Sequence, residues 1–101
     1  MAYDKVTITK STNPKKKLMA KFSDSKNIKG RTRTIHFGQA GADDYTKTKD
    51  KEQKSRYIER HRRKENWNNP QSAGALSRWV LWDKPLLRAS ISSYKSRFNL
   101  K

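Results

Sequence analysis

The chain has 101 residues, no cysteine, and 25 Lys and Arg against 9 Asp and Glu, which gives a formal net charge of +16 and a pI near 10.4. The length allows one small domain, and the lack of cysteine excludes disulfides, thiolate metal sites and a cysteine nucleophile. Such an excess of positive charge repels itself, so it favours a polyanion or an acidic protein surface as the partner.

The first third of the chain shows the two-residue alternation that is typical of short β-strands. Apolar and polar side chains alternate near residues 6–8, 18–22 and 35–37. Turn-forming residues at 11–14 and 24–30 separate these stretches. The short connections predict an antiparallel meander in the first 37 residues. The side chains expected to face the core are Val6, Ile8, Leu18, Phe22, Ile35 and Phe37.

A connection over residues 38–49 leads to the first predicted helix, which runs from Asp50 to about residue 65. The Asp50 carboxylate can cap the first backbone N–H groups, and Gln53 stands where it would complete a capping box. The apolar face of this helix is thin, so we expect most of it to face solvent or a partner. Its apolar groups are Tyr57, Ile58 and the ring of His61.

Two further helices are predicted, one on each side of Pro85. The first begins with Asn69 as N-cap and Pro70 at the first helical position, and it ends near Trp82. Within it, Gly74 lies between two alanines, which indicates a close approach to another segment. The second carries an apolar stripe at helical spacing, namely Leu87, Ile91, Tyr94 and Phe98.

Together these elements predict an α+β fold in which a small three-stranded antiparallel meander is packed with two or three C-terminal helices. We expect one domain over residues 1–101, with the meander in 1–37 and the helical part in 50–98. The longest apolar run has four residues and begins at Trp79, which is too short for a membrane span. The N-terminus lacks the apolar segment of a signal peptide, so we expect a soluble protein.

The Lys and Arg side chains are the strongest chemical signal, because cations near phosphates release condensed counterions and bind largely without regard to sequence. Two patches are expected, one on the sheet and one along the first helix. The alternatives are a solvated basic surface and an electrostatic match to an acidic protein. The sheet patch comprises Lys15, Lys16, Lys17, Arg31 and Arg33, of which the two arginines point to the same strand face; the helix patch comprises Arg56, Arg60, Arg63 and Lys64.

Aromatic side chains beside cations can stack on unpaired bases. Trp67 is the best candidate, since it lies in a short polar connection next to the helix patch. The alternative is that Trp67 closes the edge of a small core. Trp79 and Trp82 are expected in the core and at the rim of the second helix.

No catalytic constellation is visible, and the glycines form no phosphate-binding loop. A zinc site would need carboxylates such as Asp43, Asp44 or Glu65 to converge on His36 and His61, which nothing in the spacing requires. His61 and Glu65 are four residues apart, which instead indicates a stabilising pair on one helix face. We therefore expect a protein without enzymatic activity, metal, cofactor or small-molecule substrate.

Four stretches from residue 36 onward form a distinctive set: HFGQAGADDYTKTKD (36–50), RYIERH (56–61), ENWNNPQSAGALSRWVLW (65–82) and KPLLRASISSYKSRF (84–98). In these stretches, which cover roughly two thirds of the chain, the sequence resembles a family of uncharacterised small basic proteins of nucleocytoplasmic large DNA viruses, the chlorovirus-like and mimivirus-like groups. The resemblance implies a viral setting and supplies no activity.

The resemblance and the charge together predict a non-catalytic virion component. It would be a minor capsid or core protein that bridges acidic capsid-protein surfaces or the genome through its cation patches. The alternative is a sequence-tolerant nucleic-acid-binding accessory protein in the cytoplasm or nucleus of the infected cell. Neither a known nucleic-acid module nor a recognition helix is visible, and this favours the structural class.

Overall fold

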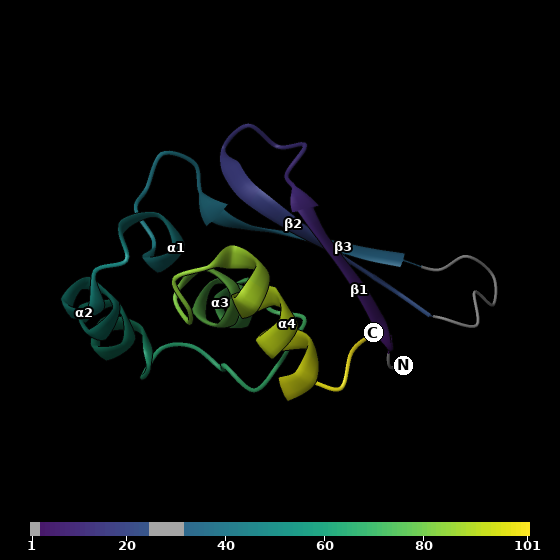
Figure 1. The fold of residues 1–101 in the computed structure, drawn as a ribbon. Helices are drawn as coiled ribbons and strands as arrows, with labels where there is room; N and C mark the ends of the chain where they lie inside the picture. Colours follow the sequence, from purple (N-terminus) through teal and green to yellow (C-terminus); the bar gives the residue numbers. More distant parts are fainter. Residues whose placement is uncertain (1–2, 25–31) are drawn as a thin grey trace.

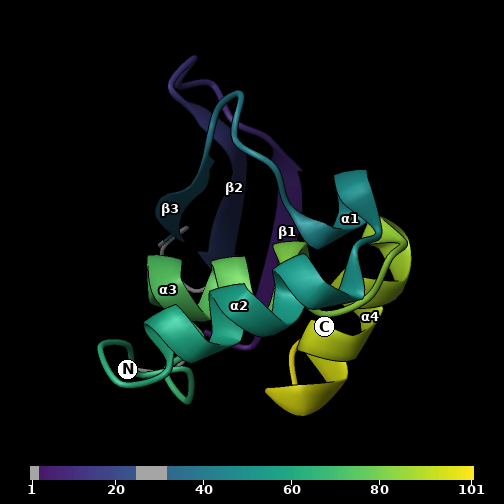
Figure 2. The same cartoon turned by 90° about the vertical axis from the view of Figure 1, so that its left-hand side faces the viewer.

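The protein has an α+β fold in a computed structural model, which describes residues 3–24 and 32–101. Three strands, β1 (Lys5–Lys10), β2 (Lys16–Ser23) and β3 (Thr32–Gln39), pair antiparallel in chain order. The helices follow and lie to one side of the sheet (Figures 1 and 2). The predicted fold class and the predicted meander are confirmed.

The register of the sheet explains which side chains enter the core. Val6 pairs with Phe22 and Leu18 pairs with Phe37, so apolar side chains line up across all three strands on one face. The other face is polar and exposed, with Thr7, Lys21 and Thr34 in one cross-strand row. Apart from Asp24, the turn predicted at 24–30 lies outside the described residues. The core face carries Val6, Ile8, Leu18, Ala20, Phe22, Ile35 and Phe37.

The predicted connection after β3 contains a one-turn helix that the sequence pattern did not indicate, α1 (Tyr45–Thr48). The carboxylate of Asp44 caps this helix by accepting hydrogen bonds from the backbone nitrogens of Thr46 and Lys47. The capping brings the Tyr45 ring, which is buried, into the core. A single turn has no apolar period to recognise, and this is why the pattern missed it.

The first predicted helix is α2 (Lys51–His61), and its expected N-cap is confirmed. Asp50 Oδ1 accepts hydrogen bonds from the backbone nitrogens of Glu52 and Gln53. The Gln53 side chain does not complete the capping box, because its Oε1 accepts instead from Thr48 Oγ1 at 2.7 Å. The helix ends four residues earlier than expected, since no apolar side chain extends its buried face beyond residue 61.

The second predicted helix starts later than expected and changes its winding. It comprises α3 (Ala73–Leu76) followed directly by a π-helical turn, η2 (Ser77–Leu81). Ser72, rather than Asn69, is the N-cap, with its Oγ accepting from the Ala75 nitrogen at 3.1 Å. Asn69 Oδ1 accepts from the Gln71 nitrogen and so caps a turn ahead of the helix.

The third predicted helix is α4 (Leu87–Arg97), and most of its apolar stripe is confirmed. Tyr94 is fully buried, and Ile91 and Phe98 pack partly buried against the core. Leu87 is a correction, because it is exposed: the core contacts of α4 begin one turn later, at Ser90 and Ile91. The neighbouring Leu86, with 63% of its surface exposed, is the most exposed large apolar side chain among the described residues.

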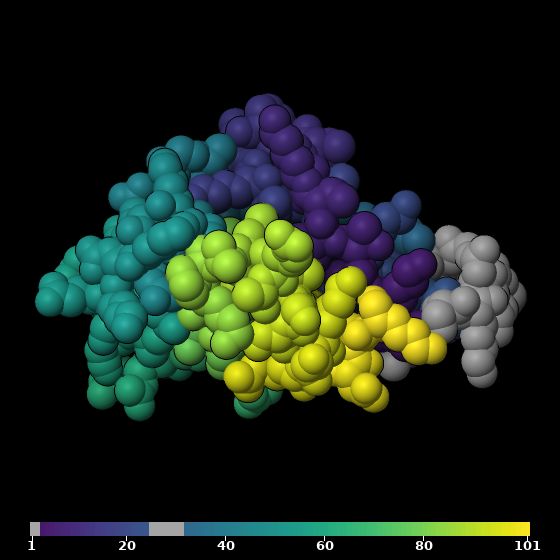
Figure 3. Space-filling model, viewed as in Figure 1, coloured from purple at the N-terminus to yellow at the C-terminus, as the bar shows by residue number. Residues whose placement is uncertain are grey.

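The last residues of the chain return to the sheet. The Val6 nitrogen donates to the Lys101 carbonyl at 3.1 Å, and the Lys101 nitrogen donates to the Asp4 carbonyl at 2.9 Å. Figure 3 shows the C-terminal segment lying beside the N-terminal strand. Backbone groups at this end of β1 are therefore paired. No helix in the described ranges is long and apolar enough to cross a membrane.

Candidate functional site

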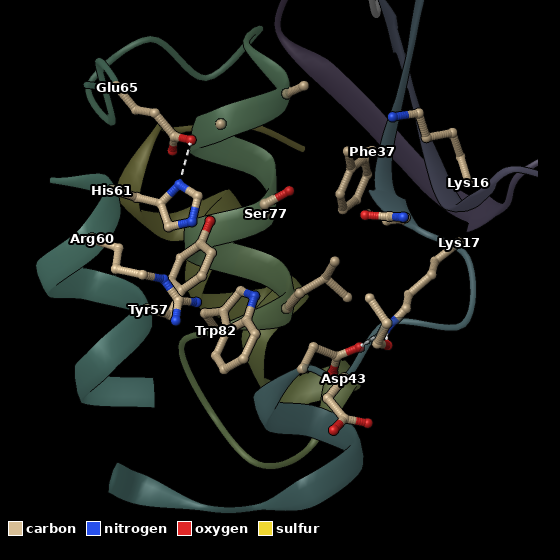
Figure 4. Close-up of a pocket in the computed structure, with 17 residues that line it drawn as sticks. Lys16, Lys17, Phe37, Asp43, Tyr57, Arg60, His61, Glu65, Ser77 and Trp82 are labelled. Atoms are coloured by element: carbon tan, nitrogen blue, oxygen red, sulfur yellow. Dashed lines mark hydrogen bonds and ion pairs between the residues drawn. The ribbon is translucent and has the colours of Figure 1, made fainter. Parts of the chain in front are cut away.

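A cleft of about 420 Å³ lies between α2, the α3–η2 segment and one end of the sheet (Figure 4). Tyr57 and Arg60 of α2 line one wall, Ser77 of η2 lies at the back, and Lys16 of β2 stands on the opposite wall. The buried rings of Phe37, Tyr57 and Trp82 give the cleft an aromatic lining. The cleft thus combines an apolar interior with cations from two elements.

The wall formed by α2 is a stack of three rings. Tyr57 stacks on Trp82 with centroids 4.5 Å apart and planes 6° apart, and His61 stacks on Tyr57 with centroids 4.3 Å apart. Tyr57 and His61 are one helical turn apart, so α2 places both on the same face. Burial, assisted by the charge of Glu65, raises the pKa of Tyr57 and keeps its hydroxyl protonated.

The carboxylates that line the cleft are all engaged within the protein. Glu65 Oε1 lies 3.0 Å from His61 Nδ1, and its Oε2 accepts from Trp67 Nε1 at 2.9 Å. Asp44 Oδ2 lies 2.5 Å from Lys17 Nζ, and Asp43 pairs with Lys47 at 3.7 Å. The predicted pair of His61 and Glu65 forms, but not on one helix face, because α2 ends at His61.

The cations of the cleft divide into one that is paired and two that are not. Lys17 is largely buried, binds Asp44 and donates to the carbonyl of Ala42, so it serves the fold rather than a partner. Lys16 and Arg60 are exposed, and within the described part of the chain neither side chain has an ion-pair or hydrogen-bond partner. Glu65 is the one cleft carboxylate that no Lys or Arg of the described residues pairs with, so the two unpaired cations still leave a positive formal charge in the cleft.

The predicted sheet patch does not form as one patch. Lys16 pairs with Gln39 at one end of β3, whereas Arg33 pairs with Phe22 near the other end. In an antiparallel hairpin the first turn and the start of the third strand lie at opposite ends, so Lys15 to Lys17 and Arg33 are separated. Arg33 donates to Gln71 Oε1 at 3.0 Å, and Arg31 lies outside the described residues.

The predicted helix patch is an exposed row. Arg56 and Arg60 are one turn apart on α2, and Arg63 and Lys64 follow the end of the helix. The one ion pair that the described residues make with this row is long, at 3.9 Å between Arg56 and Glu52. Of the four cations, Arg60 alone also lines the cleft. We call Arg56, Arg60, Arg63 and Lys64 the helix array.

Trp67 closes the edge of the core, as the second of the two interpretations predicted. Its ring meets Trp79 edge to face, with centroids 6.5 Å apart, and its Nε1 donates to Glu65. Trp79 Nε1 in turn donates to the Trp67 carbonyl at 2.9 Å. The guanidinium of Arg78 lies over both rings, 5.4 Å and 4.2 Å from their centroids. The Trp67 ring is thus held by Trp79, Glu65 and Arg78 and is partly buried against the core.

Sequence reasoning missed Tyr57 and Ser77 as site residues, and it missed Arg78 and Arg97 altogether. The Arg97 guanidinium lies 3.6 Å from the Trp79 centroid. Arg78 is partly buried, which lowers its pKa, and its Nε is the one buried side-chain polar atom without a partner in the described ranges. The four-residue spacing of Tyr57 and His61, which places both on one helix face, is the signal that could have indicated Tyr57.

The two histidines belong to separate places. His36 lies on β3, and its Nδ1 is 2.7 Å from the Oγ of Ser11 in the first turn. His61 instead faces the cleft. Among residues 3–24 and 32–101 no three His, Asp or Glu side chains gather closely enough to hold a metal ion.

Fold and cleft together define a small basic α+β protein. Residues 6–61 match the model of a family of unknown function, DUF5754, and the chain belongs to this family. The matched residues include β1 from Val6 onward and all of β2, β3, α1 and α2, and thus Lys16, Tyr57 and Arg60 of the cleft. No curated protein and no solved structure shows significant similarity to the chain.

Proposed function

We propose that this protein is a non-catalytic structural protein that holds a polyanion or an acidic protein surface through the helix array. The observation that carries the proposal is the exposure of all four array cations on one segment of nine residues. Arg56 and Arg60 are about 6 Å apart along the helix axis, a spacing at which successive anionic groups can be contacted.

The acidic side chains near the array leave its charge available. Glu52 lies 3.9 Å from Arg56, and Glu59 lies 3.3 Å from Arg62, which is not an array residue. All four of these side chains are more than half exposed, and exposed pairs of this kind contribute little to stability. A partner anion can therefore displace Glu52 from Arg56 at small cost.

The resemblance to proteins of large DNA viruses extends the proposal to a place in the virus particle. There the protein would be a minor capsid or core component that bridges acidic capsid-protein surfaces or the genome. Mass spectrometry of purified particles tests this directly. Recovery at a stoichiometric level supports the virion role, and absence from the particles overturns it.

A second candidate function is a sequence-tolerant nucleic-acid-binding accessory protein in the infected cell. The engagement of Trp67 in the core favours this form of binding over base recognition, because it leaves phosphate contacts as the available mode. Contacts of this kind do not depend on base sequence and weaken steeply with salt.

Salt titrations on DNA, RNA and poly-glutamate separate the partners. Replacing the four array cations with glutamine should reduce the salt slope on duplex DNA by roughly 3 to 4, about 0.9 for each phosphate that the variant no longer neutralises. The matched control replaces four exposed cations elsewhere and removes the same charge. Equal reductions of the salt slope in both variants, or no binding to any of the three polymers, would refute the proposal that the helix array is the binding surface. The control residues are Lys5, Lys10, Lys21 and Arg88.

A further inference from the structure

We propose that the cleft binds a phosphomonoester group, with the Tyr57 hydroxyl, the Ser77 hydroxyl and the Arg60 guanidinium as donors and Lys16 facing it across the opening. This inference goes beyond the surface binding proposed above, because Tyr57 and Ser77 lie outside the helix array. It rests on hydrogen-bonding groups that the fold leaves unused.

The Tyr57 hydroxyl is the first of these groups. Tyr57 is 7% exposed, and its oxygen is accessible and has no hydrogen-bond partner in the part of the chain that the structure describes. Tyr94 shows the usual outcome, because its ring is fully buried and its hydroxyl donates to the Pro70 carbonyl at 2.6 Å. Tyr57 differs in that its ring lines the cleft, so a ligand can reach the hydroxyl.

The neighbouring groups are also donors without partners. Neither Ser77 Oγ nor the Arg60 guanidinium makes a hydrogen bond or ion pair with any described residue. Figure 4 shows the Tyr57 hydroxyl pointing toward His61 and Ser77, with Arg60 beside the Tyr57 ring. An arginine cannot accept a hydrogen bond, and burial keeps the Tyr57 hydroxyl protonated by raising its pKa. These groups suit an acceptor-rich ligand.

Charge favours an anion over a neutral acceptor. Asp44 and Asp43 pair with Lys17 and Lys47, whereas Glu65 contacts His61 and Trp67 and keeps a negative charge near Tyr57. Lys16 and Arg60 have no such counter-charge among the described side chains. A phosphomonoester carries about −1.5 to −2 at neutral pH and has three acceptor oxygens, which match this set of donors.

Size indicates that the phosphate is attached to a larger group. A volume of about 420 Å³ exceeds what one phosphate fills and lies within the range of small-molecule sites. The edge of the Trp82 ring, which is 7% exposed, offers apolar surface to the remainder of the ligand. A free nucleoside monophosphate and the 5′-phosphorylated end of a nucleic-acid strand share this chemistry.

Calorimetric titration of the full chain with adenosine 5′-monophosphate, with adenosine and with inorganic phosphate tests the site. We expect the nucleotide to bind at least tenfold more tightly than adenosine, since hydrogen bonds to a charged group are the strong ones. Tyr57→Phe and Ser77→Ala should together weaken nucleotide binding by roughly tenfold or more. Circular dichroism melting checks that the Tyr57→Phe protein remains folded.

Arg56→Gln with Arg63→Gln is the matched control, because it removes two array charges without touching the cleft. We expect it to leave nucleotide affinity within twofold while weakening duplex DNA binding. A folded Tyr57→Phe/Ser77→Ala protein with unchanged nucleotide affinity overturns the cleft proposal and leaves the array proposal standing. An equal reduction in the control also overturns it, because binding would then follow net charge.

The two sources of the phosphate are separated with an octathymidylate strand, with and without a 5′-phosphate. If the phosphate raises affinity in the wild-type protein and not in Tyr57→Phe, the strand end is the ligand. If adenosine 5′-monophosphate binds through Tyr57 and the two strands bind alike, the free nucleotide is the ligand. Failure of both probes to depend on Tyr57 overturns the site.

Discussion

Lys17 and Asp44 form an ion pair that ties the start of β2 to the cap of α1. Lys17 Nζ lies 2.5 Å from Asp44 Oδ2, and the two side chains are 19% and 5% exposed. The same carboxylate accepts hydrogen bonds from the Thr46 and Lys47 backbone nitrogens. One buried acid thus satisfies the helix cap and the lysine together.

Lys17→Met should therefore destabilise the protein, because it leaves a buried carboxylate without its cation. We expect a decrease of about 2 to 4 kcal/mol in the free energy of unfolding, measured by urea denaturation. Lys16→Met is the control, since Lys16 is exposed and unpaired among the described residues, and it should stay within about 0.5 kcal/mol of wild type. Similar decreases in the two variants would contradict a structural role for the pair.

Gly74→Ala tests the close approach of α3 to Glu65. A Cβ atom at residue 74 would lie 2.8 Å from Glu65 Oε2, so the Glu65 carboxylate must shift, which disturbs its interactions with His61 and Trp67. We expect this to cancel or exceed the gain of about 1 kcal/mol that alanine brings to a helix. In a Glu65→Ala background the same change should stabilise by up to about 1 kcal/mol. A gain of equal size in both backgrounds would show that Glu65 does not constrain residue 74.

Stability should fall above pH 10 because of Tyr57 and Tyr94. Burial raises the pKa of both hydroxyls above the ordinary value near 10, whereas the unfolded chain ionises at that value. The contribution of the two tyrosines to the free energy of unfolding is present in full below pH 10. It is lost as the pH rises toward the pKa of the folded state. The slope is at most about 1.4 kcal/mol per pH unit for each tyrosine.

Tyrosinate absorbance at about 295 nm checks this prediction residue by residue. Tyr57→Phe and Tyr94→Phe should each remove one late-titrating group and reduce the alkaline decrease in stability. Burial lowers the pKa of Lys54, which acts in the opposite direction, because stability rises as the pH passes from the folded to the unfolded pKa of this lysine. If either tyrosine of the native protein titrates near its ordinary pKa, its side chain is not buried as described.

Variants of Trp67 distinguish a structural role of this residue from stacking on bases. Trp67→Ala should lower the free energy of unfolding by about 2 to 4 kcal/mol, because it removes the edge-to-face packing on Trp79 and the Glu65 hydrogen bond. Trp67→Phe should retain much of the packing and bind single-stranded DNA as well as wild type. A drop in affinity of roughly tenfold for a folded Trp67→Phe would instead indicate that this indole meets bases.

The sheet and the existence of three longer helices could be predicted because each depends on local patterning. Alternating residues such as Val6 and Ile8 indicate a strand wherever they occur, and Asp50 marks a helix start through its own side chain. The start of α3 was misjudged because Asn69 and Pro70 suit a turn as well as a cap. The choice depends on Ser72, whose hydroxyl holds the Ala75 nitrogen.

The cleft could not be predicted because its residues meet only in three dimensions. Lys17 looked like part of a free patch, and its partner Asp44 lies 27 residues further along the chain. Arg33 looked like a neighbour of the same patch, and the register of β3 carries it to the far end. The net charge of the chain follows from its composition. Only the fold distinguishes cations that are paired within the protein, such as Lys17, from cations that are free to bind a partner.

The π-helical turn η2 determines how Ser77 and Trp82 are oriented relative to each other in the cleft. The Trp82 nitrogen donates to the Ser77 carbonyl, five residues earlier, at 3.1 Å. The extra residue in this turn, relative to an α-helix, orients Ser77 to the back of the cleft while Trp82 lies flat under Tyr57. Removing one residue between 77 and 82 would restore α-helical winding and rotate one of these side chains by about 100° against the other. Spacing along η2 is thus as much a determinant of the cleft as the identity of the residues that line it.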